Sequence, residues 1–293
     1  MKDLREYRCA TSAAEAVALL RAGPGRGIYI AGGTDLFLMM PPGVDYVVDI
    51  NGAGLDRIER TADDELFIGA SATLQAVATS PLTQRYAGGA VAEAAVHCAN
   101  RPVRSTGTLG GNLCNALPSA DLAPILLALD ARALMSDGVR EECVPLADFF
   151  TGPRRTVLGD RLLLAILLPG RCGGSRARAR KLSRTAEDIS LVQVAVALDM
   201  DGPLIRGARV ALGAVAPTPR RAPAAEEALT GLKVLSPGAG SAIAAAAQLA
   251  AARAEPIDDH RASAAYRRAM VAVLTRRLVR ELTGLPSVEG AHP

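Results

Sequence analysis

The spacing of hydrophobic and polar residues predicts alternating helices and short strands in the first third of the chain. Ser12 and Glu15 form an S-x-x-E capping box, and Gly23 stands where the end of a helix favours a left-handed residue. We therefore expect a helix over 12–22. Short apolar runs that follow predict buried strands at 27–31, 46–50 and 66–70.

The middle of the chain shows the same mixed pattern, with more interruptions by glycine and proline. We expect a helix over 82–99, although Gly88-Gly89 weakens its middle, and a polar, glycine-rich loop over 104–115. A further helix opens at Ser119, where Pro124 is acceptable only in the first turn. Strands are predicted near Ala133 and Val144 and over 162–168.

The C-terminal part begins with a segment, 171–184, that is rich in glycine and arginine and shows no periodicity, so we interpret it as an exposed loop or domain linker. Strands over 191–200 and 209–215 form a hairpin with Asp201-Gly202 at its turn. Helices are predicted at 224–229, 241–255 and 263–282, before a tail at 286–293. The fold class is therefore α+β: an N-terminal domain over 1–172, with lobes of about 1–54 and 55–172, and a smaller α+β domain over 173–285.

Composition excludes several classes of protein. Hydrophobic residues make up 49% of the 293 residues, so the chain is not mainly disordered. A net charge of +3 and an aromatic content of 3% do not favour nucleic-acid binding. Apolar stretches such as 162–168 are far shorter than the ~18 residues of a membrane span. Because the N-terminus has no secretory signal, we expect a soluble, cytoplasmic protein.

The cysteines and histidines indicate no metal site. Since no C-x-x-C pair occurs, neither a zinc site nor a locally ligated iron–sulfur cluster is predicted, and we expect buried thiols. The cysteines are Cys9, Cys98, Cys114, Cys143 and Cys172. The histidines, His97, His260 and His292, are far apart in the sequence, and we interpret His97 as a structural or surface residue.

Two glycine pairs are the strongest candidates for a binding site. The first glycine loop, 31–36, reads Ala-Gly-Gly-Thr-Asp-Leu, and the second glycine loop, 106–112, reads Thr-Gly-Thr-Leu-Gly-Gly-Asn. Glycine lets consecutive backbone N–H groups point inward as an anion nest, so two facing loops would grip a pyrophosphate, helped by Thr34, Thr108 and Asn112. One glycine pair is usually a turn, and neither loop fits the Rossmann or Walker pattern, so spacing does not identify the ligand.

No set of catalytic side chains accompanies these loops, because neither G-x-S-x-G nor H-E-x-x-H occurs. Asp121 lies at the start of a predicted helix, where the helix dipole alone favours a carboxylate, and a ligand role is equally compatible. The arginine-rich run 176–184 is either a solvated loop or a site for phosphates or an acidic partner. A phosphate site without catalytic residues suggests a cofactor that performs the chemistry itself.

Over nearly its whole length the chain resembles the FAD-binding subunit of the molybdenum hydroxylase family, which includes the medium subunits of carbon monoxide dehydrogenase and xanthine dehydrogenase-type enzymes. The resemblance rests on the order and spacing of the two glycine loops, on Ile68-Gly-Ala70 and on the signature from Thr108 to Leu122. Further motifs that corroborate it are Phe150-Thr-Gly-Pro153, Lys181-Leu-Ser-Arg184, Val215-Ala-Pro-Thr-Pro219 and Asp259-His-Arg-Ala-Ser-Ala-Ala-Tyr-Arg267.

This resemblance implies a two-lobed fold like that of vanillyl-alcohol-oxidase-type flavoproteins, with FAD between the N-terminal lobes and its pyrophosphate on the two glycine loops. It also implies that Asp121 lies near the cofactor and that Lys181 approaches the flavin from the loop that opens the C-terminal domain. The implied FAD contacts are Ile30, Ala31, Gly32, Gly33, Thr34, Asp35, Leu36, Thr108, Leu109, Gly110, Gly111, Asn112, Asp121 and Lys181. Since neither loop contains histidine or cysteine, we expect the FAD to be non-covalent.

In function, the resemblance implies an electron-transfer subunit without catalytic side chains of its own. A large molybdopterin subunit would oxidise the substrate, and a small subunit with [2Fe–2S] clusters would pass electrons to FAD, and thence to NAD⁺, oxygen or a quinone. The molybdenum and iron–sulfur groups would belong only to those partners in a heterotrimer. The alternatives are a stand-alone FAD-dependent oxidoreductase acting on a small organic donor, and a nucleotide-binding scaffold, which the intact glycine pairs disfavour.

Overall fold

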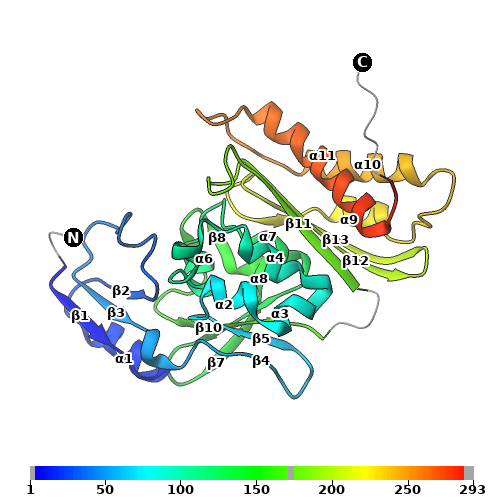
Figure 1. Ribbon diagram of the computed structural model, residues 1–293. Coiled ribbons are helices and arrows are strands. Elements are labelled where there is room, and N and C mark those ends of the chain that lie inside the picture. The colour runs from blue at the N-terminus through cyan, green and yellow to red at the C-terminus, as the bar shows by residue number, and fades with distance from the viewer. Residues whose placement is uncertain (1–3, 171–174, 287–293) are drawn as a thin grey trace.

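Three main β-sheets follow one another along the chain in the computed structural model, which describes residues 4–170 and 175–286 (Figure 1). A small parallel sheet stands at the N-terminal end, a five-stranded antiparallel sheet lies in the middle, and a four-stranded antiparallel sheet carries the C-terminal helices. No helix in the described ranges is long and apolar enough to cross a membrane. The α+β class predicted from the sequence is confirmed.

The N-terminal sheet has the order β1-β3-β2 and packs against one helix. Ser12 caps that helix as predicted, accepting a 3.2 Å hydrogen bond from the Glu15 N–H. The prediction of a left-handed Gly23 is wrong, because this residue is extended at φ −77°; a Cβ there would lie 2.1 Å from the Tyr46 ring, so close packing is what requires glycine. The elements are β1 (Glu6–Cys9), α1 (Ala13–Ala22), β2 (Gly27–Ile30), β3 (Tyr46–Asp49) and the 3-10 helix η1 (Asn51–Ala53).

The middle sheet has the order β4-β5-β10-β6-β7 and is covered by short helices. Its strands and those of a small hairpin are β4 (Ile58–Arg60), β5 (Leu66–Gly69), β6 (Arg132–Ser136), β7 (Glu141–Pro145), β8 (Phe150–Gly152), β9 (Arg155–Thr156) and β10 (Leu162–Leu168). The helices are α2 (Leu74–Thr79), α3 (Pro81–Arg85), η2 (Tyr86–Gly89), α4 (Ala90–Val96), α5 (Arg101–Arg104), α6 (Leu109–Cys114), α7 (Ala123–Ala128) and α8 (Leu146–Phe149).

Two helix predictions in this part need correction. The single helix expected over 82–99 is divided into α3, η2 and α4, because three successive residues, Ala87, Gly88 and Gly89, adopt φ values of +48°, +74° and +85°. The helix expected from Ser119 begins only at Ala123, although Pro124 does lie in its first turn.

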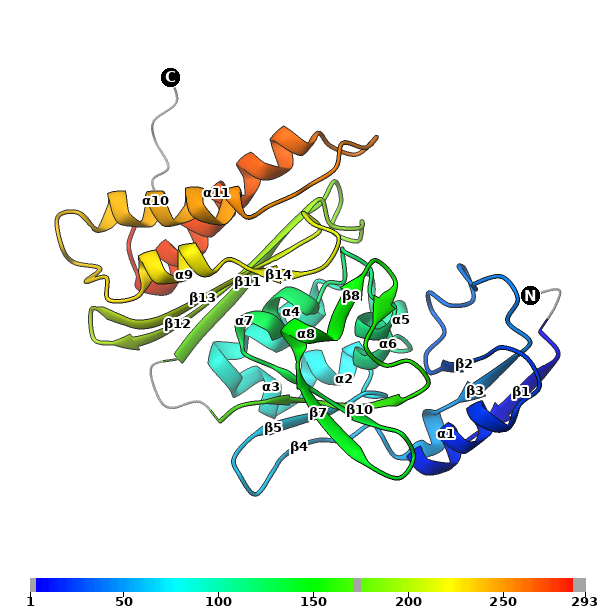
Figure 2. The ribbon, with the colours of Figure 1, turned by 180° about the vertical axis from the view of Figure 1, so that it is seen from behind.

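The C-terminal sheet, β11-β12-β13-β14, is covered on one face by α9, α10 and α11, while α4 and α7 pack against it from the middle part (Figure 2). Every residue of α7 is buried, so this helix joins the two parts. The elements are β11 (Ser175–Leu182), β12 (Val192–Asp201), β13 (Leu204–Gly213), β14 (Arg220–Arg221), α9 (Pro223–Leu229), α10 (Ala239–Ala252) and α11 (Ala264–Thr283).

The prediction of an exposed loop over 171–184 is wrong for residues 175–182, because they form β11. Arginines alternate with alanines along this strand, and Ala177 is buried in the core. Arg178 and Arg180 form ion pairs with Glu93 of α4 and Glu281 of α11, between 2.8 and 3.6 Å. The arginines therefore lie on one face of this edge strand, as a period of two requires, and their ion pairs attach the strand to α4 and α11.

A buried arginine anchors the start of α11 to this sheet. The Arg267 side chain, 4% exposed, donates to Asp259 Oδ1 at 2.7 Å and to the Leu191 carbonyl at 3.0 Å. Burial alone would raise the pKa of Asp259, but hydrogen bonds from the N–H groups of Arg261 and Ala262 and from the arginines hold it well below the ordinary 3.8. A lowered pKa stabilises the fold above pH 3.8, and this contribution is lost as the pH falls below it.

We expect Asp259→Asn to lower the free energy of unfolding at neutral pH by about 2 kcal/mol, because it removes the counter-ion of buried Arg267. The difference from wild type should narrow as the pH falls below the ordinary pKa of 3.8, because the Asp259 carboxylate of the unfolded wild-type chain then binds a proton while the folded one stays ionised. Urea unfolding at neutral and acid pH measures both quantities. A difference that stays constant over that range would contradict the assignment.

Candidate functional site

The first glycine loop leaves four consecutive backbone N–H groups free. Within the described part of the chain, the N–H groups of Gly32, Gly33, Thr34 and Asp35 donate to no protein acceptor, whereas the Gly33 carbonyl accepts from the Phe37 N–H at 3.0 Å. Gly33 has φ +65°, the left-handed conformation that glycine adopts without strain. A row of free amides is the arrangement that an anion nest requires.

The two glycine loops pack backbone against backbone. A Cβ on Gly32 would lie 1.9 Å from the Thr106 carbonyl oxygen and 3.0 Å from the Gly107 Cα, and a Cβ on Gly107 would lie 3.2 Å from Thr34 Oγ1. Only glycine permits so close an approach. The fold therefore brings together two segments that are far apart in the sequence.

The second glycine loop differs from the nest that the sequence predicts, because its amides are already hydrogen-bonded within the protein. The N–H groups of Leu109 and Gly110 donate to two carbonyls just after β5, at 2.9 and 2.8 Å. Thr108 Oγ1 accepts from the Gly111 N–H at 3.0 Å and so caps α6. The expectation of a second row of free amides is wrong, while the Thr108 hydroxyl, which accepts from Gly111, keeps its own proton to donate.

The two glycines of this second pair have different surroundings. A Cβ on Gly110 would lie 2.7 Å from the Ala70 carbonyl oxygen and 2.8 Å from the Ala70 Cβ, so this glycine lets α6 pack on the end of β5. Gly111 is exposed, and among the described residues a Cβ there would meet only Thr108 Oγ1, at 3.0 Å. Gly111 therefore presents bare backbone at the surface, where a ligand can approach.

Several predicted site residues direct their side chains into the protein. Ile30 and Leu109 are buried, and Leu36 packs against the small cluster that contains Ile30. The Ala31 carbonyl accepts from Asn51 Nδ2 at 3.2 Å. Ile30 and Leu109 can thus meet a ligand only through their backbone.

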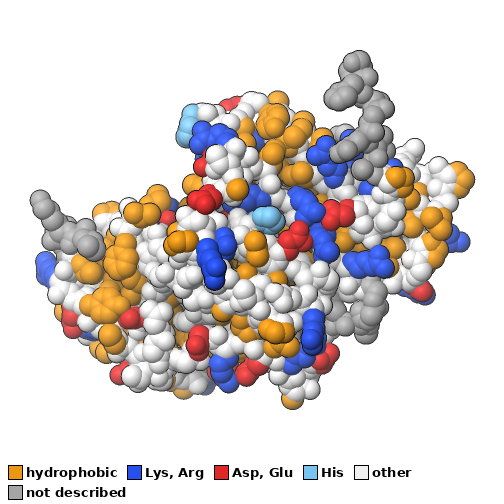
Figure 3. All heavy atoms as spheres, viewed as in Figure 1, with side chains coloured by type: hydrophobic (Ala, Val, Ile, Leu, Met, Phe, Trp, Pro, Cys, Tyr) orange, Lys and Arg blue, Asp and Glu red, His pale blue; other side chains and the backbone are white. Residues whose placement is uncertain are grey.

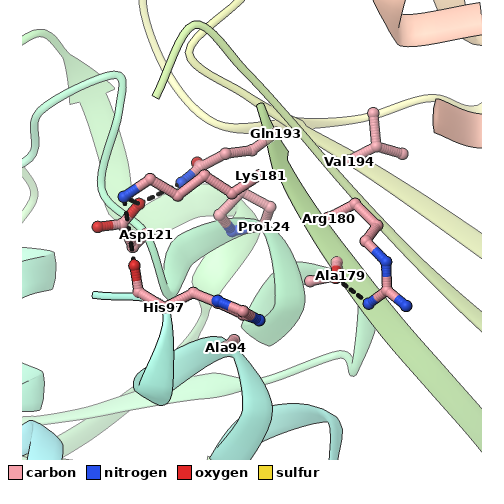
Figure 4. A pocket seen from close by; sticks show the side chains of 9 residues that line it. All are labelled: Ala94, His97, Asp121, Pro124, Ala179, Arg180, Lys181, Gln193 and Val194. Atoms are coloured by element: carbon pink, nitrogen blue, oxygen red, sulfur yellow. Dashed lines mark hydrogen bonds and ion pairs between the residues drawn. The ribbon is translucent and has the colours of Figure 1, made fainter. Parts of the chain in front are cut away.

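A second group of polar residues lies where the middle part meets the C-terminal sheet. Lys181 Nζ on β11 is 3.2 Å from Asp121 Oδ1 and donates to the His97 carbonyl at 3.3 Å (Figure 4). Asp121 Oδ1 also accepts from Ser190 Oγ at 3.0 Å and from Gln193 Nε2 at 2.6 Å. The fold thus joins two predicted residues that are far apart in the sequence, and Lys181 lies on a strand rather than on the predicted loop.

The ion pair is largely removed from water, since its side chains are 10% and 18% exposed. Burial raises the pKa of Asp121, and the charge and hydrogen bond of Lys181 oppose that rise. Asn112 connects this group to the second glycine loop, because its Oδ1 accepts from the Leu122 N–H at 3.3 Å. The two halves of the candidate site are therefore continuous.

Sequence reasoning missed Ser190 and Gln193, which hold Asp121 in place. Gln193 is 4% exposed within the apolar run of β12, and a lone amide in such a run was the available signal. A pocket beside the ion pair is lined from α4, α7, β11 and β12 (Figure 4). Charged side chains gather along the same junction on the surface (Figure 3).

Cys98 and His97 both lie beside the ion pair: the Cys98 thiol interacts with the Asp121 carboxylate, and the His97 carbonyl accepts from Lys181. Within the described ranges no group of His, Cys, Asp and Glu could hold a metal ion, and His97 is exposed, as predicted. Cys98 is buried, but the prediction of buried thiols is wrong for Cys9 and Cys143, which are exposed on edge strands β1 and β7. Predictions about Cys172 and His292 lie outside the described residues.

Two protein-family models match the chain. Residues 2–171 match the FAD binding domain in molybdopterin dehydrogenase, and residues 177–282 match the C-terminal domain of the carbon monoxide dehydrogenase flavoprotein. The chain belongs to the FAD-binding subunits of the molybdopterin dehydrogenases. It is therefore the flavoprotein subunit of an oxidoreductase.

Individual relatives agree with this family. The xanthine dehydrogenase FAD-binding subunit of Escherichia coli O157:H7 is 34% identical over 235 residues, covering 78% of this chain and 80% of the relative. The carbon monoxide dehydrogenase medium chain of Hydrogenophaga pseudoflava is 30% identical over 276 residues, covering 93% of this chain and 94% of the relative.

Solved structures show the same fold. Carbon monoxide dehydrogenase from Hydrogenophaga pseudoflava superposes with a TM-score of 0.88 at 31% identity, over 94% of this chain and 96% of that chain. Quinoline 2-oxidoreductase from Pseudomonas putida 86 gives 0.86 at 27% identity, over 96% and 97%. The architecture of this FAD-binding subunit is therefore that of the family.

The residues present fit an FAD. A diphosphate is the anionic part of that cofactor, and the row of free amides in the first glycine loop can accept it without a counter-ion. The exposed backbone at Gly111 leaves room for a ligand beside the second glycine loop.

Proposed function

We propose that this FAD-binding subunit transfers electrons within a three-subunit molybdenum hydroxylase. Its electrons would come from the [2Fe–2S] clusters of a small partner subunit, which a large molybdopterin subunit reduces, and would leave to NAD⁺, oxygen or a quinone. The observation that carries the proposal is the row of four free amides, packed against a second glycine loop, in a chain whose sequence has no catalytic set. Such a site holds a reactive cofactor and leaves the organic substrate to another subunit.

The proposed FAD contacts are the residues predicted from the sequence. The free amides of the first glycine loop would bind the diphosphate, with Gly111 and Asn112 on the opposite side and Asp121 and Lys181 toward the flavin. The full set is Ile30, Ala31, Gly32, Gly33, Thr34, Asp35, Leu36, Thr108, Leu109, Gly110, Gly111, Asn112, Asp121 and Lys181. The absence of histidine and cysteine from both loops supports non-covalent binding.

When bound, FAD exchanges electrons singly with an iron–sulfur cluster and in pairs with an acceptor. The residues of this chain bind and orient it. The backbone amides hold the diphosphate, while the Lys181–Asp121 pair joins β11 to the segment before α7 and fixes the C-terminal sheet against the helices of the middle part.

The division into domains is also a proposal: an FAD-binding domain over 1–172, with lobes of about 1–54 and 55–172, and a C-terminal domain over 173–285. The ranges of the two family models, 2–171 and 177–282, support it. The separate sheets, one for each lobe and one for the C-terminal domain, support it as well.

The electron path is tested by purifying the affinity-tagged chain with its partners from its native host and reducing the assembly with dithionite. We expect molybdenum and iron in the assembly, and reoxidation of the flavin by NAD⁺, oxygen or a quinone analogue, followed at its visible absorbance. An isolated chain that turns over small organic donors without partners would contradict the proposal and favour a stand-alone oxidoreductase.

A further inference from the structure

Two residues with left-handed backbone conformations lie close to the glycine loops. Ala116, just after α6, has φ +47°, and Arg154, in the turn between β8 and β9, has φ +56°, although neither is glycine. They are joined directly, because the Arg154 N–H donates to the Ala116 carbonyl at 2.8 Å. This hydrogen bond holds the end of α6 against the turn that carries Arg154.

The strained turn directs the Arg154 guanidinium toward both glycine loops. Nη1 donates to Asn115 Oδ1 at 3.1 Å, and Nη2 donates to Met39 Sδ at 3.3 Å. Asn115 Nδ2 in turn donates to the Asp35 carboxylate. Arg154 therefore connects the end of α6 to the segment of the first glycine loop, and β8 lies beside α6 in both ribbon views (Figures 1 and 2).

The carboxylate of Asp35 would disfavour an anionic ligand on the first glycine loop, and the connection to Arg154 offsets this effect. Its N–H is one of the four free amides, so its carboxylate belongs to the same short loop that would bind an anionic diphosphate. The Asp35 carboxylate and a bound diphosphate are both negatively charged and would repel each other. In a partly buried loop this repulsion is screened less than it is in bulk water. Asn115 holds the Asp35 carboxylate, and Arg154 adds a positive charge behind Asn115.

We infer that Arg154 is a positioning residue for FAD: through Asn115 it restrains and offsets the Asp35 carboxylate, so that the first glycine loop can accept a diphosphate. This inference rests on the proposed function, and it goes beyond the predicted contact set, which contains neither Arg154 nor Asn115. A purely structural role is a weak alternative, since Arg154 is exposed and surface contacts of this kind contribute little to stability.

The test is the dissociation constant of FAD for the full chain, from the quenching of flavin fluorescence. Arg154→Ala should weaken binding about tenfold at low salt, and added salt should reduce this defect. Arg155→Ala is the matched control, because Arg155 is an exposed neighbour whose side chain makes no hydrogen bond or ion pair among the described residues, and its loss should leave binding unchanged. Asn115→Ala should weaken binding at least as much, and combining it with Arg154→Ala should add no further loss, because Arg154 acts through Asn115.

The outcomes separate the inference from the function on which it rests. If Arg154→Ala binds FAD as tightly as Arg155→Ala, or if its loss of affinity adds in full to that of Asn115→Ala, the inference is overturned while the FAD site stands. If Arg154→Ala lowers the free energy of unfolding by as much as it lowers the free energy of FAD binding, its role is structural and the inference fails. A wild-type chain that binds no FAD overturns the proposed function and this inference together.

Discussion

Replacing Gly111 with valine is expected to weaken FAD binding by about 100-fold while leaving the fold intact. Gly111 is exposed, and among the described residues a Cβ there would meet only Thr108 Oγ1, at 3.0 Å, so a small shift of that hydroxyl accommodates the side chain. It would instead occupy the surface that the diphosphate is proposed to cover. Equilibrium titration with FAD, beside circular dichroism of the same sample, measures both effects.

The neighbouring Gly110 provides the matched control. A Cβ at Gly110 would lie 2.7 Å from a backbone oxygen after β5, so Gly110→Val should disturb the packing of α6 and lower the urea midpoint. Comparing the valine variants of these two adjacent glycines therefore distinguishes the loss of a ligand-binding surface from the loss of structure. A Gly111→Val variant that retains FAD with wild-type affinity would show that the diphosphate lies elsewhere.

Replacing Lys181 with methionine is expected to lower the free energy of unfolding by about 3 kcal/mol near neutral pH, because it leaves the Asp121 carboxylate buried without its cation. Ser190 and Gln193 still hydrogen-bond that carboxylate, which keeps the loss from being larger. Urea unfolding of the full chain measures the change.

Two controls separate this charge effect from lost packing. The pKa of Asp121 is already raised by burial and would rise further without Lys181, so the deficit should shrink as the pH is lowered from neutral and the carboxyl becomes protonated in the folded variant. The double variant with Asp121→Asn should recover most of the lost stability at neutral pH. A double variant as unstable as Lys181→Met alone would mean that the charge pair is not the cause.

The elements that could be predicted from the sequence are those with local signals. The Ser12 cap, the strands at 27–31 and 46–50 and the hairpin around Gly202 all follow from spacing and turn chemistry, and the structure confirms them. The first glycine loop was likewise recognisable, because adjacent glycines after a buried strand are a backbone signal.

What could not be predicted depends on contacts between distant segments. The alternating arginines and alanines of β11 are also typical of a solvated loop. They form a strand here because the fold brings Glu93 and Glu281 close enough to pair with the arginines. The amides of the second glycine loop look free until carbonyls after β5 are found beside them. The strained Arg154 carries no local signal, since its neighbours Asn115 and Met39 come from other parts of the chain.

The most direct test of the central claim is the flavin content of the tagged chain isolated with its partners under native conditions. We predict one FAD per chain, released intact by acid precipitation and identified by chromatography, which establishes non-covalent binding. An assembly that contains molybdenum and iron but little or no FAD would contradict the account, because this chain is the subunit to which it assigns the flavin.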